Sequence, residues 1–379
     1  MDILITGAAG FVGKNLIAAL EAIRDGKDRT RPGLKVGRIF AITRASTPQD
    51  LKAACAQADF VFHLAGVNRP EDPAEFMTGN RDLTAAVLEA LDEAGNSCPV
   101  LLTSSVHGAG DTPYGVSKRA AEDLVFAHEK NVLVYRLPHI FGKWCRPFYN
   151  SAVATFCHQA AHDLPLTVTD PDRELELVYI DDLVAAFLDA LEGKPCRDGK
   201  FCAVPVTHRA ALGQIAEALE AFRANPLDLP GLEPGSLEGK LYAAYLSCLP
   251  REKISLPLAP RADFRGSFTE LLRPGGGQLS VIVTKPGQTR GQHWHHSKWE
   301  IFVTVSGTGL IRQRKLGMDR VLEFPVRGDR PEAVWMLPGY THSITNLSEK
   351  EDLVTLIWAS EVFDPQRPDT YYEEVGSWN

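Results

Sequence analysis

Residues 287–307, GQTRGQHWHHSKWEIFVTVSG, decide how the second half of this chain folds. His293 and His295 stand two residues apart, so in an extended strand both imidazoles leave the same face. Glu300 follows closely, and a further histidine, His342, lies well downstream. Three histidines and one glutamate on strand-like segments can surround a single divalent cation such as Zn, Ni, Mn or Fe. The pattern therefore predicts a metal site formed by these four side chains.

The spacing G-x5-H-x-H-x4-E-x6-G resembles the first motif of the cupin superfamily, without a gap. The second cupin motif, P-x-G-x-x-H-x-x-x-N, is matched at Gly339, His342 and Asn346. Leu337 stands where this motif has proline, and Pro338 follows it. The resemblance implies a small β-barrel that holds one divalent metal, with Zn as the expected ion. Because some cupins hold no metal, the alternative is that these are ordinary polar residues of a barrel mouth.

The length of 379 residues is too great for one ordinary core and predicts two domains. No apolar run reaches the roughly 20 residues of a membrane helix, and the N-terminal residues lack the features of a signal peptide. We therefore expect a cytoplasmic protein with no membrane partner. A net charge of -8 gives no general attraction for nucleic acid. The seven cysteines are odd in number and scattered, which predicts reduced thiols.

A glycine-rich turn near the N-terminus predicts a dinucleotide site. The apolar strand 3–5 leads into Gly7-x-x-Gly10-x-x-Gly13, and a helical pattern runs from Asn15 to Ile23. Such a turn lets the backbone approach a pyrophosphate, while the helix N-terminus supplies unpaired N–H groups and partial positive charge. The residues of this turn expected to contact the cofactor are Gly7, Gly10, Phe11, Val12 and Gly13.

Two following strands complete the predicted cofactor site. Strand 38–44 ends in Arg44, where an acidic residue would bind a ribose 2'-hydroxyl. Since arginine suits a 2'-phosphate, NADPH is preferred over NADH, unless Arg44 is simply a surface residue. Strand 59–66 is nearly continuous in apolar side chains, as expected of a strand buried on both faces. Its last residues, Leu64, Ala65 and Gly66, are expected to line the cofactor, and His63 is expected to be structural.

A serine pair followed by tyrosine and lysine predicts ketone reduction. Strand 100–103 leads to Ser104 and Ser105, and Tyr114 and Lys118 stand four apart at the start of a helix, on one face. We expect the lysine ammonium to stabilise the phenolate and to lower the pKa of Tyr114 from about 10 toward neutrality. Tyrosine can then exchange a proton with a carbonyl oxygen as hydride moves, with a serine hydroxyl holding that oxygen.

These motifs, together with VYIDDLV around Asp181 and Asp182, resemble the extended, nucleotide-sugar type of short-chain dehydrogenase/reductases. The resemblance covers about the first 240 residues and implies a Rossmann-type doubly wound parallel sheet that binds NADP. The residues that it implies for catalysis are Ser105, with Ser104 as the alternative, Tyr114 and Lys118, and the lysine also contacts the cofactor.

The chain also departs from that family. The interval from Ser105 to Tyr114 is short, His139 stands where many relatives carry asparagine, and Arg173 is displaced from the position of a diphosphate-binding arginine. Substrate contacts are therefore harder to assign than cofactor contacts. Alternative substrate contacts, which could equally be surface and packing residues, are Lys143, Arg146 and Asn150.

The change of composition near residue 227 marks the end of the reductase. Residues 227–260 are rich in Pro, Gly and Leu, which predicts the end of the first domain and a connector. We expect a reductase domain at 1–250, a linker at 251–260 and an all-β cupin domain at 261–379 that binds the metal and acts as an epimerase. The segment DFRGSFTE at residues 263–270 resembles the opening of cupin-type deoxysugar epimerases.

Over its whole length, the chain closely resembles the bifunctional capsular-polysaccharide enzymes that act on UDP-2-acetamido-2,6-dideoxy-4-keto sugars. The residues that carry this resemblance, besides the motifs above, are NRP at 68–70 and HWHH at 293–296. It implies that the cupin epimerises the UDP-linked 4-keto-6-deoxy amino sugar at C3 and that the reductase then reduces the C4 ketone with NADPH. The implied product is UDP-2-acetamido-2,6-dideoxy-L-talose, a precursor of UDP-N-acetyl-L-fucosamine for capsule or O-antigen.

Some features stay open at this point. The candidates for the epimerising base, by residue type only, are His296, Tyr340 and Asp263. A homodimer is expected, because extended reductases and cupins both commonly pair. Two other functions are compatible with the motifs: a reductase fused to a cupin dioxygenase, and a non-catalytic sensor of NADP and sugar. The intact Tyr114 and Lys118 argue against the sensor, which has no need of a proton relay.

Overall fold

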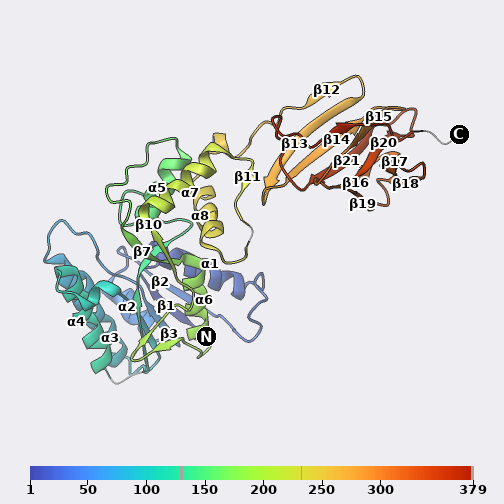
Figure 1. Cartoon of the computed structure of the whole chain (residues 1–379). Helices are drawn as coiled ribbons and strands as arrows, with labels where there is room; N and C mark the ends of the chain where they lie inside the picture. The colour runs from blue at the N-terminus through green and yellow to red at the C-terminus, as the bar shows by residue number, and fades with distance from the viewer. Residues whose placement is uncertain (129–130, 232, 377–379) are drawn as a thin grey trace. The chain divides into compact units, whose positions relative to one another are not determined.

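The computed structural model describes residues 1–128, 131–231 and 233–376, which form two compact units (Figure 1). Unit 1 comprises Met1–Glu220 and Lys240–Leu249, and unit 2 comprises Ala221–Gly239 and the chain from Pro250 onward. The first domain predicted at 1–250 includes residues 221–239, whereas in the structure these residues group with unit 2. The reason is that β11 (Asp228–Leu229) pairs in parallel with β13 (Gly266–Pro274). The linker predicted at 251–260 stays a prediction.

Unit 1 is built on a sheet of seven strands in the order β2-β1-β3-β4-β5-β9-β8. The strands β1 (Ile3–Thr6), β2 (Ile39–Ile42), β3 (Phe60–His63), β4 (Val100–Ser105) and β5 (Val132–Leu137) are parallel, and β9 (Phe201–Cys202) and β8 (Arg197–Asp198) complete the sheet. A second sheet joins β10 (His208–Ala211), β7 (Glu174–Tyr179) and β6 (His139–Phe141). Parallel neighbours that are not consecutive in the chain require crossovers, which the helices supply.

The helices of unit 1 follow the strands in the predicted alternation. They are α1 (Phe11–Arg24), α2 (Pro48–Cys55), α3 (Leu83–Glu93), α4 (Pro113–Ala127), α5 (Ala152–Ala161), α6 (Ile180–Leu191), α7 (Leu212–Ala224) and α8 (Leu237–Leu246), with short helical turns η1 (Met77–Asp82) and η2 (Val106–Ala109). A further short turn, η3 (Arg251–Lys253), belongs to unit 2. None of those among the described residues is long and apolar enough to cross a membrane. Helix α8 lies within residues 227–260, which the sequence predicted to be the end of the first domain and a connector, and its residues from Lys240 belong to unit 1.

Helices cover both faces of the large sheet. From β1, Ile3 and Ile5 pack with Leu16 of α1 and Phe187 of α6, whereas Leu4 packs in a separate cluster that includes residues of α2 and α3. Alternate side chains of one strand therefore enter two different apolar layers, which explains the consecutive apolar residues Ile3, Leu4 and Ile5 of β1. The predicted doubly wound α/β fold is confirmed.

His63 is buried at the end of β3 and serves the fold, as the sequence indicated. Its Nδ1 lies 2.7 Å from the Thr6 hydroxyl, and its Nε2 lies 2.9 Å from the Thr84 hydroxyl. Thr84 donates its own proton to the Asn80 carbonyl at 2.7 Å, so it accepts from Nε2–H, and Nδ1 accepts from Thr6. Burial first, and then the charge of Lys118, lowers the pKa of His63 to about 3.

This histidine predicts an acid-sensitive stability. The unfolded chain takes up the proton near its ordinary pKa of 6.5, whereas the folded chain resists it until about pH 3. Stability should therefore be independent of this group above pH 6.5 and fall by up to about 1.4 kcal/mol per pH unit between pH 6.5 and 3. Urea unfolding at pH 7, 6 and 5 should show a steeper loss for wild type than for His63→Gln. Equal slopes for the two proteins would contradict this role.

From Arg261 onward, the described part of unit 2 is all-β and forms two sheets, one of which also includes β11 (Figure 1). One has the order β11-β13-β14-β21-β16-β19, with β12 paired to β13; the other has the order β18-β17-β20-β15-β22. The strands not yet given are β12 (Arg261–Asp263), β14 (Gln278–Thr284), β15 (Thr289–Trp294), β16 (Glu300–Ser306), β17 (Thr308–Lys315), β18 (Val321–Arg327), β19 (Ala333–Met336), β20 (Tyr340–Asn346), β21 (Leu353–Ala359) and β22 (Tyr371–Tyr372). Ile282 and Phe302 of the first sheet pack with Ile311 and Ile344 of the second, which confirms the predicted all-β second part.

Candidate functional site

The turn between β1 and α1 is closed so tightly that side chains are excluded from it. Gly7 has φ +70°, and a Cβ on it would lie 2.7 Å from the Ala65 nitrogen. A Cβ on Gly13 would lie 2.4 Å from the Gly7 carbonyl oxygen. The helix begins at Phe11 after Gly10, which offers no side-chain cap. The backbone N–H groups of the first turn are therefore open to a ligand, and the turn fits a dinucleotide pyrophosphate.

The loop after β3 lies against both this turn and α4, the helix that carries Tyr114 and Lys118. The Ala65 nitrogen donates to the Thr6 hydroxyl at 3.2 Å, and a Cβ on Gly66 would lie 3.5 Å from Lys118 Nζ. The buried Asn80 holds the loop in place, because it bonds both backbone groups of Val67, at 3.0 and 2.9 Å. Its amide also donates to Ser117 at 2.9 Å. The sequence analysis missed Asn80, since a polar residue inside a helical stretch gives no local signal.

The predicted catalytic residues lie together at the carboxyl end of β4. Ser105 ends that strand, and Tyr114 lies in the first turn of α4, where its phenol interacts with the Ser105 hydroxyl. Lys118 is buried one turn later and donates from Nζ to the Thr103 carbonyl at 2.7 Å. Ser105 Oγ also accepts from the backbone N–H of His107 at 3.2 Å, which orients the hydroxyl.

The pKa values at this site correct one expectation. Burial raises the pKa of Tyr114 above its ordinary value of 10, and the interaction with Ser105 offsets only part of the rise. The expected lowering toward neutrality is therefore not present, because Lys118 donates to Thr103. Burial lowers the pKa of Lys118 itself to about 8, against the opposing charge of Glu122. Tyr114 is thus a protonated phenol at neutral pH, suited to giving a proton.

Ser104, the alternative hydroxyl, is engaged elsewhere. It donates to Oε1 of the buried Glu122 at 2.5 Å, and Arg136 donates to both carboxylate oxygens at 2.9 and 2.6 Å. The carboxylate of Glu122, a residue of α4, is therefore fully paired. This arrangement favours Ser105 over Ser104 as the residue that faces Tyr114.

The structure does not bring the residues predicted as substrate contacts together in one site. His139 lies edge-on to His107, with 6.3 Å between the ring centroids, and His107 lies 6.4 Å from the ring of Tyr114. Lys143 pairs with Asp181, and Arg146 lies over the ring of Tyr149 at 5.2 Å. Arg44 and Asn150 are exposed, on the turn after β2 and on the loop before α5. His107, which the sequence analysis missed, is the imidazole nearest to Tyr114 among these residues.

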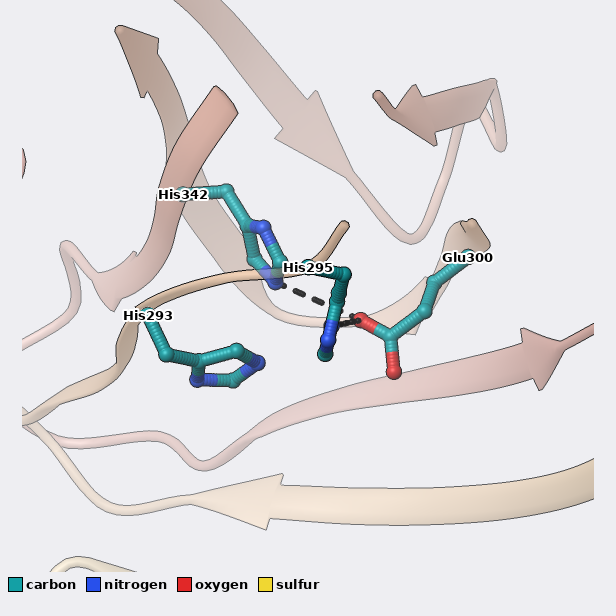
Figure 2. Close-up of side chains that lie close together, drawn as sticks. All are labelled: His293, His295, Glu300 and His342. Carbon is teal, nitrogen blue, oxygen red and sulfur yellow. Dashed lines mark ion pairs between the residues drawn. The ribbon is translucent and has the colours of Figure 1, made fainter. Parts of the chain in front are cut away.

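In unit 2, the four predicted metal ligands converge on one point (Figure 2). Their ligand atoms all lie within 4.8 Å of one another. Glu300 Oε2 lies 3.6 Å from His295 Nε2 and 3.3 Å from His342 Nε2. The register of β15 against β20 shifts between Gly291 and His293, and Gln292 has φ +59°. This β-bulge sets His293 directly opposite His342.

The second motif supports the cluster from β20. Gly339 has φ +73° and donates its N–H to the His295 carbonyl at 2.8 Å. Asn346 donates to the Thr284 carbonyl at 2.8 Å and so ties β20 to the other sheet. Gly339 and Asn346 thus hold the ligand strands, and the displaced proline leaves the position of His342 intact.

The chemistry of the donor set fits a divalent cation. Within the described part of the chain, no hydrogen bond satisfies the buried Glu300 Oε2 or the Nε2 atoms of His295 and His342. Burial first, and then the neighbouring His342, lowers the pKa of His293 to about 4. Burial favours a neutral Glu300, but the adjacent imidazoles outweigh it and hold the pKa of Glu300 below its ordinary value. Deprotonated imidazole and carboxylate groups are the forms that bind a metal.

Comparison with known proteins shows the same two-part organisation. The sequence profile of the NAD dependent epimerase/dehydratase family matches residues 3–198, and that of the polysaccharide biosynthesis C-terminal domain matches residues 261–371. A UDP-2-acetamido-2,6-beta-L-arabino-hexul-4-ose reductase from Pseudomonas aeruginosa is 41% identical over 99% of each chain. The chain belongs to the family of this reductase.

Two solved structures agree with this assignment along the whole chain. The capsular polysaccharide assembling protein CapF from Staphylococcus aureus has a TM-score of 0.89 and 42% identity, covering 99% of this chain and 100% of that one. CapF with the inhibitor 3-isopropenyl-tropolone has a TM-score of 0.83 and 39% identity, with the same coverage. The family is therefore one of nicotinamide-dependent enzymes whose second part is all-β, as the fold shows.

The three residues predicted as candidates for the epimerising base lie in different surroundings. His296 is exposed and packs on Trp294 and Tyr371, with ring centroids 4.6 and 5.1 Å away. Asp263 is paired with Arg265 at 2.7 Å. Tyr340 is two residues before His342 on β20, so both side chains leave the same face of the strand. Strand alternation therefore favours Tyr340 as the group nearest to the cluster.

Proposed function

We propose that this chain is a bifunctional nucleotide-sugar enzyme. Unit 2 epimerises a UDP-2-acetamido-2,6-dideoxy-4-keto-hexose at C3, and unit 1 reduces the C4 ketone with NADPH to UDP-2-acetamido-2,6-dideoxy-L-talose, for capsule or O-antigen synthesis. The observation that carries the proposal is the presence on one chain of a Ser105–Tyr114–Lys118 group and a buried His/Glu cluster with unpaired donor atoms. The name of the Pseudomonas relative supports the substrate class and the reduction.

The reduction uses the phenol of Tyr114 as proton donor. NADPH supplies the hydride when it is bound at the glycine-rich turn. Tyr114 gives its proton to the developing alkoxide, and the Ser105 hydroxyl holds the same oxygen. Lys118, with a pKa of about 8, is mostly charged at neutral pH, and its ammonium, bonded to the Thr103 carbonyl, puts positive charge beside the Gly66 loop where the cofactor would lie. Arg44, exposed after β2, is our candidate for the 2'-phosphate that distinguishes NADPH from NADH.

The epimerisation depends on acidifying the hydrogen at C3. A divalent metal, for which we propose Zn, supplies positive charge that stabilises the negative charge developing on the ketone oxygen. His293, His295, Glu300 and His342 would hold it, and Tyr340, on the same strand face as His342, is our candidate for the base that exchanges the C3 proton. The tropolone inhibitor of CapF supports a metal, because a tropolone carries adjacent carbonyl and hydroxyl oxygens that chelate cations. Reduction of the same ketone then consumes the labile epimer.

We also propose that the protein is a homodimer that works in the cytoplasm, where NADPH and UDP-sugars are made. The face of the large sheet of unit 2 that points away from the core is apolar, yet none of these side chains is fully buried. They are Leu279, Val281, Val283, Ile301, Val303, Val305, Val354, Leu356 and Trp358. A second copy would cover this face. Light scattering should give twice the chain mass of 41.6 kDa, and Leu356→Lys should reduce it toward one chain.

The direct test is turnover of a UDP-linked 4-keto-6-deoxy amino sugar in D2O without oxygen. Our proposal requires that the wild type oxidise NADPH and that deuterium enter at C3. Reaction only in the presence of O2 would support the dioxygenase alternative. Binding of NADPH and sugar with neither oxidation nor exchange would support the sensor and exclude the two-step reaction.

A further inference from the structure

The C-terminal residues 360–375, which we call the C-terminal strap, run beside the segment that carries three of the four cluster residues. Within the strap, β22 pairs with β15, with Tyr372 opposite His293. The Glu373 nitrogen donates to the Gln292 carbonyl at 3.0 Å, at the β-bulge. At the other end of the segment, the Ser360 nitrogen donates to the Trp299 carbonyl at 3.0 Å, and the Trp299 nitrogen donates to the Ser360 hydroxyl at 3.2 Å. The strap therefore follows the ligand segment from residue 292 to residue 299.

One residue of the strap, Asp369, holds the loop between His295 and Glu300. Its Oδ1 accepts from the His296 nitrogen at 2.9 Å. Its Oδ2 accepts from the backbone nitrogens of Ser297 and Lys298, both at 3.0 Å, and from the Ser297 hydroxyl at 3.2 Å. Four donors from three consecutive residues thus converge on a single carboxylate. Such charge-assisted bonds fix the path of the loop between two cluster residues.

The backbone of the same residue acts on His295 directly. The imidazole Nδ1–H donates to the Asp369 carbonyl at 2.5 Å, which places the proton on Nδ1. The lone pair of His295 then lies on Nε2, the buried atom that has no hydrogen-bond partner among the described residues. Asp369 has φ +34°, a conformation that aspartate, asparagine and glycine tolerate best. This backbone geometry lets the carbonyl reach His295 while the carboxylate reaches the loop.

We propose that Asp369 is a positioning residue for the metal centre: its carboxylate fixes the loop that sets His295 against Glu300, so the affinity for the metal depends on the C-terminal strap. The inference rests on the proposed metal site. It concerns a residue outside the donor set, since Asp369 acts through His295 and the loop. Hydrogen-bonded partners of metal ligands commonly contribute 10- to 100-fold in metal affinity.

Other contacts keep the strap in place when the carboxylate is removed. Lys298 Nζ donates to the Pro368 carbonyl at 3.2 Å and lies 3.8 Å from Glu361. Arg314 donates to the Val375 carbonyl at 2.9 Å and to Glu373 at 2.8 Å. A change at Asp369 therefore removes the loop contacts selectively and does not release the whole strap.

The test compares three variants of the full chain. Asp369→Gly removes the carboxylate but tolerates the same φ, and Asp369→Asn keeps one acceptor oxygen. The matched control is Asp364→Ala, in the same strap, whose carboxylate accepts from Gln366 and contacts no cluster residue. Zn²⁺ alone is titrated against a chromophoric chelator. We expect affinity to fall about 10- to 100-fold for Asp369→Gly, less for Asp369→Asn, and not at all for Asp364→Ala.

A second measurement distinguishes a change in the positions of the metal ligands from a general loss of metal affinity. The visible absorption of Co²⁺ bound to the site reports ligand geometry, so it should change in Asp369→Gly, be restored largely in Asp369→Asn and be unaltered in Asp364→Ala. Wild-type Zn²⁺ affinity in Asp369→Gly overturns the proposal, and should Asp369→Gly not fold, undiminished Zn²⁺ affinity in Asp369→Asn overturns it. Absence of Zn²⁺ binding by the wild type would instead refute the metal site itself.

Discussion

Tyr114→Phe should abolish NADPH oxidation while deuterium still enters the sugar at C3. The change removes only the phenolic oxygen, which we propose as the proton donor at the ketone in unit 1. Loss of a general acid typically costs 10²- to 10⁴-fold in rate, so oxidation should fall by about that factor. In the proposed mechanism exchange at C3 depends on the cluster of unit 2, so it should continue. The measurement is NADPH absorbance together with mass spectrometry of the sugar after incubation in D2O.

The structure allows this change without loss of the fold. Ser105 keeps its bond from the His107 backbone, and Lys118 keeps its bond to Thr103, so neither polar group is left unpaired. Tyr149→Phe is the matched control, because Tyr149 is exposed and lies under Arg146, and it is not one of the three proposed catalytic residues, Ser105, Tyr114 and Lys118. NADPH binding should be the same in all three proteins. If Tyr114→Phe reduces the ketone at the wild-type rate, these three residues do not catalyse the reduction.

The fold and both residue clusters were predictable because their signals are local. The turn from Gly7 to Gly13 needs residues without side chains at two closely approached positions, so the glycines themselves mark it. Strands buried on both faces carry consecutive apolar residues, as Ile3, Leu4 and Ile5 of β1 show. The spacing of His293 and His295 likewise reports strand alternation.

Other features depend on parts of the chain that are distant in sequence. The pairing of β11 with β13, which brings residues 221–239 into unit 2, rests on backbone bonds that any sequence can make. The contacts of Asp369 with the loop after His295 join residues more than 70 positions apart. The pKa of Tyr114 depends on its burial and on where Lys118 points, neither of which follows from a four-residue spacing. These properties therefore required the structure.

Glu300→Gln should have the opposite effect to Tyr114→Phe. The substitution keeps the shape of the side chain but removes the only negative charge among the four cluster residues, beside His295 and His342. Because loss of a partner of a ligand already costs 10- to 100-fold, we expect loss of the ligand itself to lower Zn²⁺ affinity by more than about 100-fold. Deuterium exchange at C3 should disappear with the metal, and excess Zn²⁺ should restore part of it.

The reductase should survive this change, which makes the two variants complementary. NADPH binding by Glu300→Gln should equal that of wild type, and a ketone supplied already inverted at C3 should still be reduced. Glu323→Gln is the control, because Glu323 pairs with Arg312 on β17 and β18, at a half-exposed position. If Glu300→Gln retains both metal and exchange, the cluster is only a polar interior and epimerisation must be placed elsewhere. If it retains metal but loses exchange, Glu300 acts on the substrate, and the proton transfer now attributed to Tyr340 passes to this carboxylate.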